Sequence, residues 1–312
     1  MELVGSVVKK NIDEFCLCQF YVNENNVMNT KYINPIKKIN LHLHTSVSDG
    51  ALAPRALIER SRAIGLDLIS ITDHDTTDAY RLIGEADLGL RLLPGIEISS
   101  QHEGNDVHIL AYGYDIDAPG LNELTEMYLI GRRDRAVKML DKLSKLGMDI
   151  ALDEVVAVAG SRELIVRPHI AQVMVAKGYC ATKNEAFEKF IGNFKPAYYP
   201  KPEVSVEDSL KVIHDAGAWA VIAHPGKLTD PSYLDLFIEM GIDGIEVWHP
   251  DHSSAQVRDF NAKALKNNLL MTAGSDFHGE QDRHNLMDIV PASAEVIDSV
   301  NFMWSDYSCR KL

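Results

Sequence analysis

The segment KINLHLH, residues 38–44, alternates apolar and polar side chains and opens a series of similar segments. A period of two is typical of a β-strand, and it places His42 and His44 on one face. A helix is expected over residues 54–64, because a proline opens this segment and a glycine follows it. Another apolar segment follows at residues 66–74. This strand–helix–strand order predicts parallel β/α architecture.

Five more strands are predicted in the segments RLLPGIEIS, DVHILAYGY, WAVIAHP, DGIEVWHP and LLMTAGSDFH. Seven strands suit a distorted (β/α)7 barrel of the TIM type, an α/β fold. The pattern over residues 118–202 is helical throughout, which predicts an all-helical insertion that caps the substrate. The barrel would then comprise residues 37–117 and 203–290. Residues 1–36 would be an N-terminal extension without an assigned role, and residues 291–312 a C-terminal helix or tail.

Composition limits the classes of function. The chain of 312 residues has 31 Lys and Arg against 45 Asp and Glu, a formal charge of −14. This balance excludes broad binding of duplex nucleic acid, which needs a basic surface. Four cysteines without a paired motif are typical of free thiols in a reducing compartment. Without a membrane-length apolar run or a signal peptide pattern, the sequence predicts a cytoplasmic protein with no membrane partner.

Histidines and carboxylates gather at the predicted strand ends. In a parallel barrel the carboxyl ends of all strands meet at one rim, so these side chains are expected to converge. Nine ligands exceed one tetrahedral site and suffice for two or three ions that share a carboxylate. Imidazole and carboxylate without cysteine suit Mn²⁺, Fe²⁺, Zn²⁺ or Mg²⁺. The candidate ligands are His42, His44, Asp49, His74, Glu97, His108, His224, Asp276 and His278.

Six short motifs, LHLHTSVSDG, ITDHDT, GIEIS, VHIL, IAHPG and GSDFH, occur in this order. Together they resemble the PHP (polymerase and histidinol phosphatase) phosphoesterases over residues 39–279. The resemblance is strongest to the subgroup of 3′,5′-nucleoside-bisphosphate phosphatases and 5′-to-3′ exoribonucleases. It implies the PHP form of the (β/α)7 barrel with three divalent ions. Manganese is expected, with zinc, iron(II) and magnesium as alternatives.

The resemblance also implies three ligand sets. The first ion would be held by His42, His44, Glu97 and Asp276. The second ion would share Glu97 as a bridge and add His108 and His224. The third ion would be held by Asp49, His74 and His278. Asn40 departs from the family pattern, which usually has Asp at this place, but no ligand is lost.

Three residues of the predicted insertion are candidates for substrate binding. Arg167 and His169 match an Arg-x-His of the subgroup at a helix start, where a phosphate is favoured. A salt bridge at the helix start is the alternative for Arg167. Lys195 matches a Gly-Lys-Pro segment and could bind a second phosphate, or be an exposed loop lysine. His169 could also give a proton to the leaving alcohol.

Other polar residues receive simpler interpretations. Asp73 and Asp75 flank His74 and are expected to orient imidazoles, with surface carboxylates as the alternative. Glu246 and His252 are interpreted as structural. Three further histidines are interpreted as surface residues: His102, His214 and His284.

These observations predict a metal-dependent phosphoesterase. A hydroxide that bridges two ions would attack the phosphate, with Glu97 as the shared carboxylate. The expected substrate is a small nucleotide, with release of the 3′-phosphate of a nucleoside 3′,5′-bisphosphate. The alternative is 5′-to-3′ trimming of short 5′-phosphorylated RNA at the same site. A metal hydrolase of C–N bonds and a non-catalytic module are further alternatives. Hydrolases of that kind often carry a carbamylated lysine at a strand end, and no predicted strand here ends in lysine.

Overall fold

The computed structural model describes residues 35–84, 88–159, 165–200, 202–280, 284–287 and 290–311. Residues 1–34 of the predicted extension lie outside the described residues. From Ile36 onward the chain forms one compact unit. Its strands are β1 (Ile39–Asn40), β2 (Leu68–Ile69), β3 (Arg91–Leu92), β4 (Gly95–His102), β5 (Asn105–Tyr112), β6 (Trp219–Ile222), β7 (Gly244–Trp248) and β8 (Leu270–Ala273).

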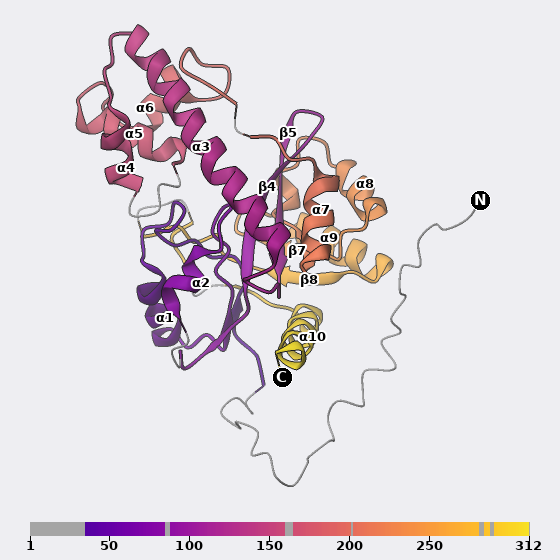
Figure 1. Ribbon diagram of the computed structural model, residues 1–312. Coiled ribbons are helices and arrows are strands. Elements are labelled where there is room, and N and C mark those ends of the chain that lie inside the picture. Colours follow the sequence, from indigo (N-terminus) through magenta and orange to yellow (C-terminus); the bar gives the residue numbers. More distant parts are fainter. Residues whose placement is uncertain are drawn as a thin grey trace. The chain divides into compact units, whose positions relative to one another are not determined.

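Helices separate most of these strands (Figure 1). The helices between strands and at the C-terminal end are α1 (Pro54–Ala63), α2 (Asp78–Ile83), α7 (Val206–Asp215), α8 (Tyr233–Met240), α9 (Ser254–Asn267) and α10 (Ala294–Arg310). The predicted insertion contains α3 (Pro119–Lys145), α4 (Leu152–Ala159), α5 (Arg167–Ala176), α6 (Lys183–Ala186) and a π-helical turn (Phe187–Ile191). No helix of the described residues is both long and apolar enough to span a bilayer.

The described strands form two sheets rather than one closed barrel. The first has the order β1-β2-β3 and the second the order β4-β5-β6-β7-β8. Backbone hydrogen bonds join the two sheets at two places, after β1 and after β2. Leu41 N donates to Ala273 O at 3.1 Å, and Glu97 N donates to Asp73 O at 3.3 Å. Segments from β1, β2, β4 and β8 are therefore held beside one another.

The prediction that all strands run parallel is wrong for β5. This strand is antiparallel to both β4 and β6, whereas β6, β7 and β8 run parallel. The reason is the connection, because only Glu103 and Gly104 separate β4 from β5. Both residues have positive φ, 49° and 78°, as a tight hairpin turn requires. A parallel crossover needs about a dozen residues or more.

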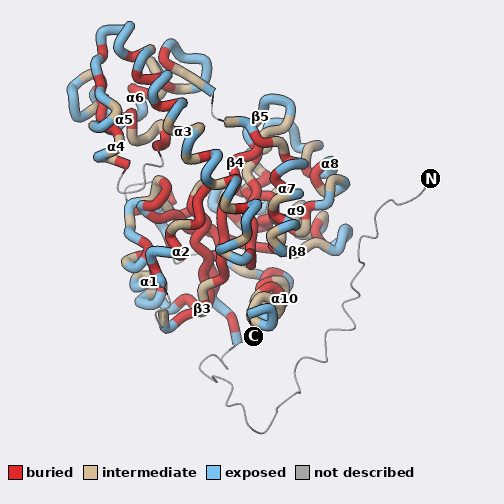
Figure 2. Tube along the Cα trace, viewed as in Figure 1, coloured by how far each residue is buried: buried red, intermediate tan, exposed pale blue. Residues whose placement is uncertain are grey.

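Two separate hydrophobic cores lie within this unit (Figure 2). The larger core packs the sheets against the helices between them, and the smaller one lies wholly in the helical insertion. Helix α3 contributes to both: Tyr128 packs into the larger core, and Met139 packs into the smaller one. The insertion therefore has an apolar core of its own and is joined to the sheets by α3.

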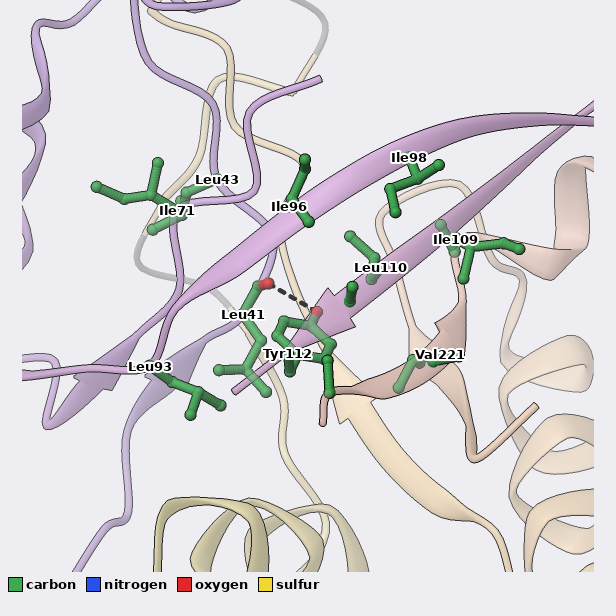
Figure 3. Packing of buried hydrophobic residues seen from close by; sticks show 14 of the residues in the cluster. Leu41, Leu43, Ile71, Leu93, Ile96, Ile98, Ile109, Leu110, Tyr112 and Val221 are labelled. Atoms are coloured by element: carbon green, nitrogen blue, oxygen red, sulfur yellow. Dashed lines mark hydrogen bonds between the residues drawn. The ribbon is translucent and has the colours of Figure 1, made fainter. Parts of the chain in front are cut away.

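The centre of the larger core lies where β4 and β5 cross the segment after β1 (Figure 3). Leu41, Ile96 and Leu110 are fully buried there. The Tyr112 hydroxyl donates to Leu41 O at 2.8 Å, so this buried polar group is satisfied. This packing fixes the backbone on both sides of His42 and Glu97, the residues on which the site depends.

Candidate active site

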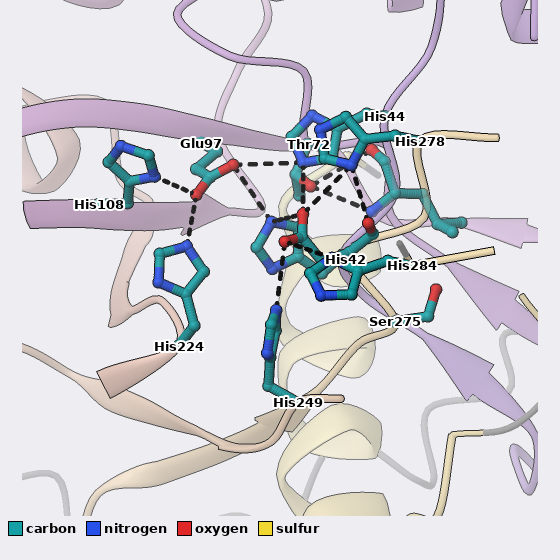
Figure 4. A network of polar contacts seen from close by, with 12 residues as sticks. His42, His44, Thr72, Glu97, His108, His224, His249, Ser275, His278 and His284 are labelled. Carbon is teal, nitrogen blue, oxygen red and sulfur yellow. Dashed lines mark hydrogen bonds and ion pairs between the residues drawn. The ribbon is translucent and has the colours of Figure 1, made fainter. Parts of the chain in front are cut away.

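All nine predicted ligands lie in one cluster, which we call the nine-residue cluster. Figure 4 shows Glu97 of this cluster with His42, His44, His108, His224 and His278. Most of them stand at or just beyond the ends of parallel strands. His108 is an exception, because it lies in the middle of the antiparallel β5, opposite Ser99 of β4. His224 and Asp276 follow β6 and β8 with positive φ values of 29° and 53°. Non-glycine residues rarely adopt this conformation, and such strain is concentrated at functional sites.

The Glu97 carboxylate is the centre of the cluster. Its Oε1 atom lies 2.7 Å from His108 Nδ1 and 3.0 Å from His224 Nε2. Its Oε2 atom lies 3.2 Å from the Nε2 atoms of both His42 and His44. The two oxygens thus face two different groups of imidazoles, as a carboxylate shared between two ions would.

A further group lies around Asp49, in the loop after β1. The Oδ1 atom of Asp49 is 3.3 Å from His278 Nε2, and its Oδ2 atom is 3.8 Å from His74 Nε2. His44 joins this group through Nδ1, 3.8 Å from Asp49, while its Nε2 faces Glu97 and Asp276. His44 therefore belongs to two groups, which the sequence analysis did not expect.

The donor set fits divalent metal ions. Among the described residues, both ring nitrogens of His44 and Nδ1 of His74 are buried and form no hydrogen bond of suitable geometry, although carboxylate oxygens lie 3.1 to 3.8 Å from them. Burial of such atoms is costly unless they bind something. Three combinations of three or four of the nine side chains bring their ligand atoms within 4.8 Å of one another. Imidazole and carboxylate donors in this arrangement could hold several ions.

The electrostatics of the cluster differ between its members. Burial opposes protonation of His42, His44 and His278, but nearby carboxylates outweigh it and raise the pKa of all three. Burial lowers the pKa of His74 and of His224 to about 4, so both imidazoles are neutral at pH 7. Burial would raise the pKa of Glu97, but His74 and His108 lower it well below its usual range. Burial also opposes ionisation of Asp49, and again the nearby His74 and His278 lower its pKa. The carboxylates are therefore ionised.

Residues around the cluster hold the ligands in place. Glu246 of β7, interpreted from sequence as structural, accepts a hydrogen bond from His42 Nδ1 at 2.9 Å. It also accepts one from His224 N at 2.7 Å. Such a contact orients a ligating imidazole and sets its tautomer. Asn40 donates to Ser275 Oγ at 2.7 Å and so ties β1 to the turn before Asp276.

Asp73 and Asp75 act on loops, and their hydrogen bonds go to other groups than imidazoles. Asp73 accepts from Thr45 N at 2.7 Å and from Ser48 Oγ at 2.7 Å, which secures the loop that carries Asp49. Asp75 accepts from Ser99 N at 2.7 Å and forms a buried ion pair with Arg132 of α3. The expectation that they orient imidazoles is therefore wrong, because their oxygens are already used. Their burial excludes the surface alternative.

Two buried histidines beside the cluster were missed. His284, interpreted from sequence as a surface residue, is only 9% exposed and lies between Asp251 and Asp276. His249 was not singled out, although it is fully buried and follows β7. A signal was present, because His-Pro follows both β6 and β7, and the first of these histidines is His224.

The three predicted substrate-binding residues lie near one another in the insertion. Arg167 begins α5 and donates to Asn193 Oδ1 at 2.7 Å, and its guanidinium lies over Tyr198. Lys195 is exposed in the turn that follows Asn193. Burial lowers the pKa of His169, and the Asp49 carboxylate opposes this shift, so His169 faces the field of the cluster.

Comparison with known proteins gives a consistent result. The model of the PHP domain family matches residues 40–191. A "5′-3′ exoribonuclease" from Haemophilus influenzae is 32% identical over 250 residues, covering 78% of this chain and 90% of the relative. A "3′,5′-nucleoside bisphosphate phosphatase" from Chromobacterium violaceum is 34% identical over 265 residues, covering 81% and 93%.

Solved structures agree with these relatives. A crystal structure from Bifidobacterium adolescentis, named as that of a metal-dependent phosphoesterase, superposes with a TM-score of 0.77 at 33% identity. The match covers 87% of this chain and 97% of the other. Fold, cluster and sequence likeness thus lead to one conclusion: this chain belongs to the PHP domain family.

Proposed function

We propose that this metal-dependent phosphoesterase releases the 3′-phosphate from nucleoside 3′,5′-bisphosphates, with three divalent ions held by the nine-residue cluster. The observation that supports this most is the division of Glu97, whose two oxygens face separate groups of histidines. The backbone hydrogen bonds that join the two sheets after β1 and after β2 favour a closed (β/α)7 barrel around the cluster. The cytoplasmic location stays a prediction from the sequence.

The chain's residues divide into those that hold ions and those that hold substrate. Divalent ions bound at the cluster would supply a hydroxide nucleophile and neutralise charge on the phosphoryl oxygens. Manganese suits the mixture of imidazole and carboxylate donors, with zinc, iron(II) and magnesium as alternatives. Arg167, His169 and Lys195 would bind a phosphate that is not cleaved. His169 would also donate a proton to the leaving alcohol.

His169 is suited to that proton transfer. Its Nδ1 atom accepts a hydrogen bond from Val166 N at 3.3 Å, so a neutral His169 carries its proton on Nε2. Burial lowers the pKa of His169. The charged form of an imidazole with a lower pKa gives up its proton more readily. His169 is only partly buried, so part of the residue is open to solvent.

A second candidate function is trimming of short 5′-phosphorylated RNA from its 5′ end. The relative named as an exoribonuclease supports it, and the same cluster would serve both reactions. The group bound by Arg167 would then be the 5′-phosphate of the RNA. Neither substrate is a duplex, so both are compatible with the net charge of −14, which disfavours binding of duplex nucleic acid.

Hydrolysis of a C–N bond is less consistent with the site. Enzymes of that kind often need a carbamylated lysine as a ligand. Lys227 is near the cluster, but its Nζ atom lies 3.1 Å from Asp251 Oδ2 and 3.5 Å from Asp276 Oδ2. Both contacts pair Nζ with a carboxylate, so this nitrogen is engaged in ion pairs on that side of the cluster. A non-catalytic module would not need nine converging ligands.

A phosphate-release screen tests the proposal. Purified full-length protein, loaded with Mn²⁺, is assayed with nucleoside 3′,5′-bisphosphates, mononucleotides and 5′-phosphorylated RNAs of a few nucleotides. Elemental analysis of the same sample should give close to three ions per chain. We expect the bisphosphate to be turned over fastest and no release after chelation. Preference for RNA would support the second function, and full activity with at most one ion would contradict the three-ion site.

A further inference from the structure

A second group of polar side chains lies against the nine-residue cluster, around the other oxygen of Asp276. It consists of the buried His249 and His284 (Figure 4) and the partly exposed Asp251, with Lys227 at its edge. His249 is fully buried and His284 is 9% exposed. Neither histidine is among the nine, so their burial beside charged groups requires an explanation.

The two oxygens of Asp276 face different partners. Oδ1 lies 3.3 Å from His42 Nε2 and 3.1 Å from His44 Nε2, within the nine-residue cluster. Oδ2 lies 3.2 Å from His249 Nε2 and 3.2 Å from His284 Nδ1, outside it. In Glu97 both oxygens face cluster histidines, whereas in Asp276 only one does. Asp276 therefore offers a single oxygen to an ion of the cluster.

The hydrogen bonds of His249 determine where its ring proton is. The Asp251 N–H donates to His249 Nδ1 at 3.1 Å, so Nδ1 is an acceptor and carries no proton. The proton of a neutral ring must then be on Nε2, which faces Asp276 Oδ2. A protonated nitrogen cannot bind a metal ion, but it is a good donor to a carboxylate.

His284 contacts carboxylates on both sides of its ring. Its Nε2 atom lies 3.2 Å from Asp251 Oδ2, and its Nδ1 atom faces Asp276. Carboxylates accept hydrogen bonds, so an N–H on either nitrogen of His284 is a donor to the carboxylate that it faces. Lys227 Nζ, 3.5 Å from Asp276 Oδ2, adds a third positive or donating group on this side. A metal ion at the same place would be repelled by this ammonium.

We propose that His249 and His284 are positioning residues: they hold Oδ2 of Asp276 by two N–H donors and so leave Oδ1 as its only metal-binding atom. The inference rests on the proposed function, in which Asp276 is a metal ligand. The two donors would keep the carboxylate from turning to bind with both oxygens. The competing interpretation is a further ion bound by His249, Asp276 and His284, whose side chains are close enough for one.

Variants that keep or remove the donor distinguish the two interpretations. The amide NH₂ of Gln reaches about the position of imidazole Nε2, and that of Asn about the position of Nδ1. His249→Gln and His284→Asn therefore keep a donor to Asp276, whereas His249→Ala and His284→Ala remove it. His214→Ala is the control, because His214 lies on α7 and pairs with Asp243 instead.

The measurements are Mn²⁺ content by elemental analysis and Mn²⁺ affinity by competition with a chelator, on the full chain. We expect every variant to bind as many ions as the parent at saturation. The alanine variants should bind Mn²⁺ about 10- to 100-fold more weakly, because loss of a hydrogen bond to a metal-binding side chain weakens metal affinity by about that factor. His249→Gln, His284→Asn and the control should stay close to the parent. If one alanine variant does not fold, the other still provides the comparison.

Three results would overturn the inference. Loss of one ion at saturation in both His249→Ala and His249→Gln would make His249 a ligand of a further ion. Unchanged Mn²⁺ affinity in both alanine variants would show that the two donors do not act on Asp276. Equal weakening in the alanine and donor-keeping variants would indicate a packing role. A parent chain that binds no Mn²⁺ would instead refute the proposed function, so the two failures are distinguishable.

Discussion

The nine-residue cluster and the helical insertion differ in how their polar residues are supported. The cluster residues stand on or next to strands, and His42, His44 and Glu97 are almost completely buried. The insertion residues stand at a helix start and in a turn, over a separate apolar core. Buried, mutually bonded groups have fixed geometry, whereas half-exposed ones can meet a ligand from solvent. The difference is consistent with the proposed division, in which the sheets hold ions and the insertion holds substrate.

The largest effect is expected from Glu97→Gln, which tests the cluster side of this comparison. Removing the charge affects two groups of histidines at once. Loss of a residue that only hydrogen-bonds to a metal ligand costs up to about 100-fold, and kcat of Glu97→Gln should fall by more than that. Phosphate release at saturating Mn²⁺ measures the loss, and elemental analysis shows the ions. Glu123→Gln, on the exposed side of α3, is the control. Activity within a few-fold of the parent would show that Glu97 is not shared between ions.

Arg132→Met tests the connection between the two regions. Arg132 lies on α3 between the segments that pack into the two cores, and its ion pair with Asp75 is buried. Loss of one partner leaves a buried charge, which costs about 3–5 kcal/mol in the free energy of unfolding. Urea unfolding of Arg132→Met and of the double variant with Asp75→Asn measures this. The double variant should recover part of the loss; equal loss in both would mean that the charge of Asp75 is not responsible.

Arg167→Ala tests the insertion side. If Arg167 grips a phosphate that is not cleaved, kcat/KM for a bisphosphate should fall about 10- to 100-fold, the loss of one charge-assisted contact. p-Nitrophenyl phosphate, which has only the scissile phosphate, should be slowed far less. Metal content should not change. Equal losses on both substrates would assign Arg167 to the reacting phosphoryl group or to the fold.

The smallest effect is expected from Glu154→Gln. Glu154 pairs with Lys177 at 2.8 Å on the insertion, where both side chains are well exposed. Exposed pairs contribute little because water and salt screen them. Thermal unfolding and bisphosphate turnover should both match the parent. A clear loss of turnover would mean that this face of the insertion contacts substrate, which would blur the division between the two regions.

Local pattern identified nine side chains that the structure brings together, because strand ends and His-x-His spacing are visible in one dimension. It failed where partners are distant in the chain. His284 has no local pattern that marks burial, and its partners Asp251 and Asp276 are brought to it only by folding. The direction of β5 is the opposite case. Its two-residue connection was present in the sequence, and the expectation of a uniform β/α repeat obscured it.

The sequence by itself determined which residues offer metal-binding atoms, since donor chemistry and the faces of strands are local properties. It also determined the family, because six motifs occur in one order. Only the tertiary structure decided which oxygen of each carboxylate faces which histidine. Only the tertiary structure showed that Glu246 contacts His42 and that His249 contacts Asp276. Hydrogen-bond partners, and the ring proton that follows from them, depend on distances between segments that are remote in the chain.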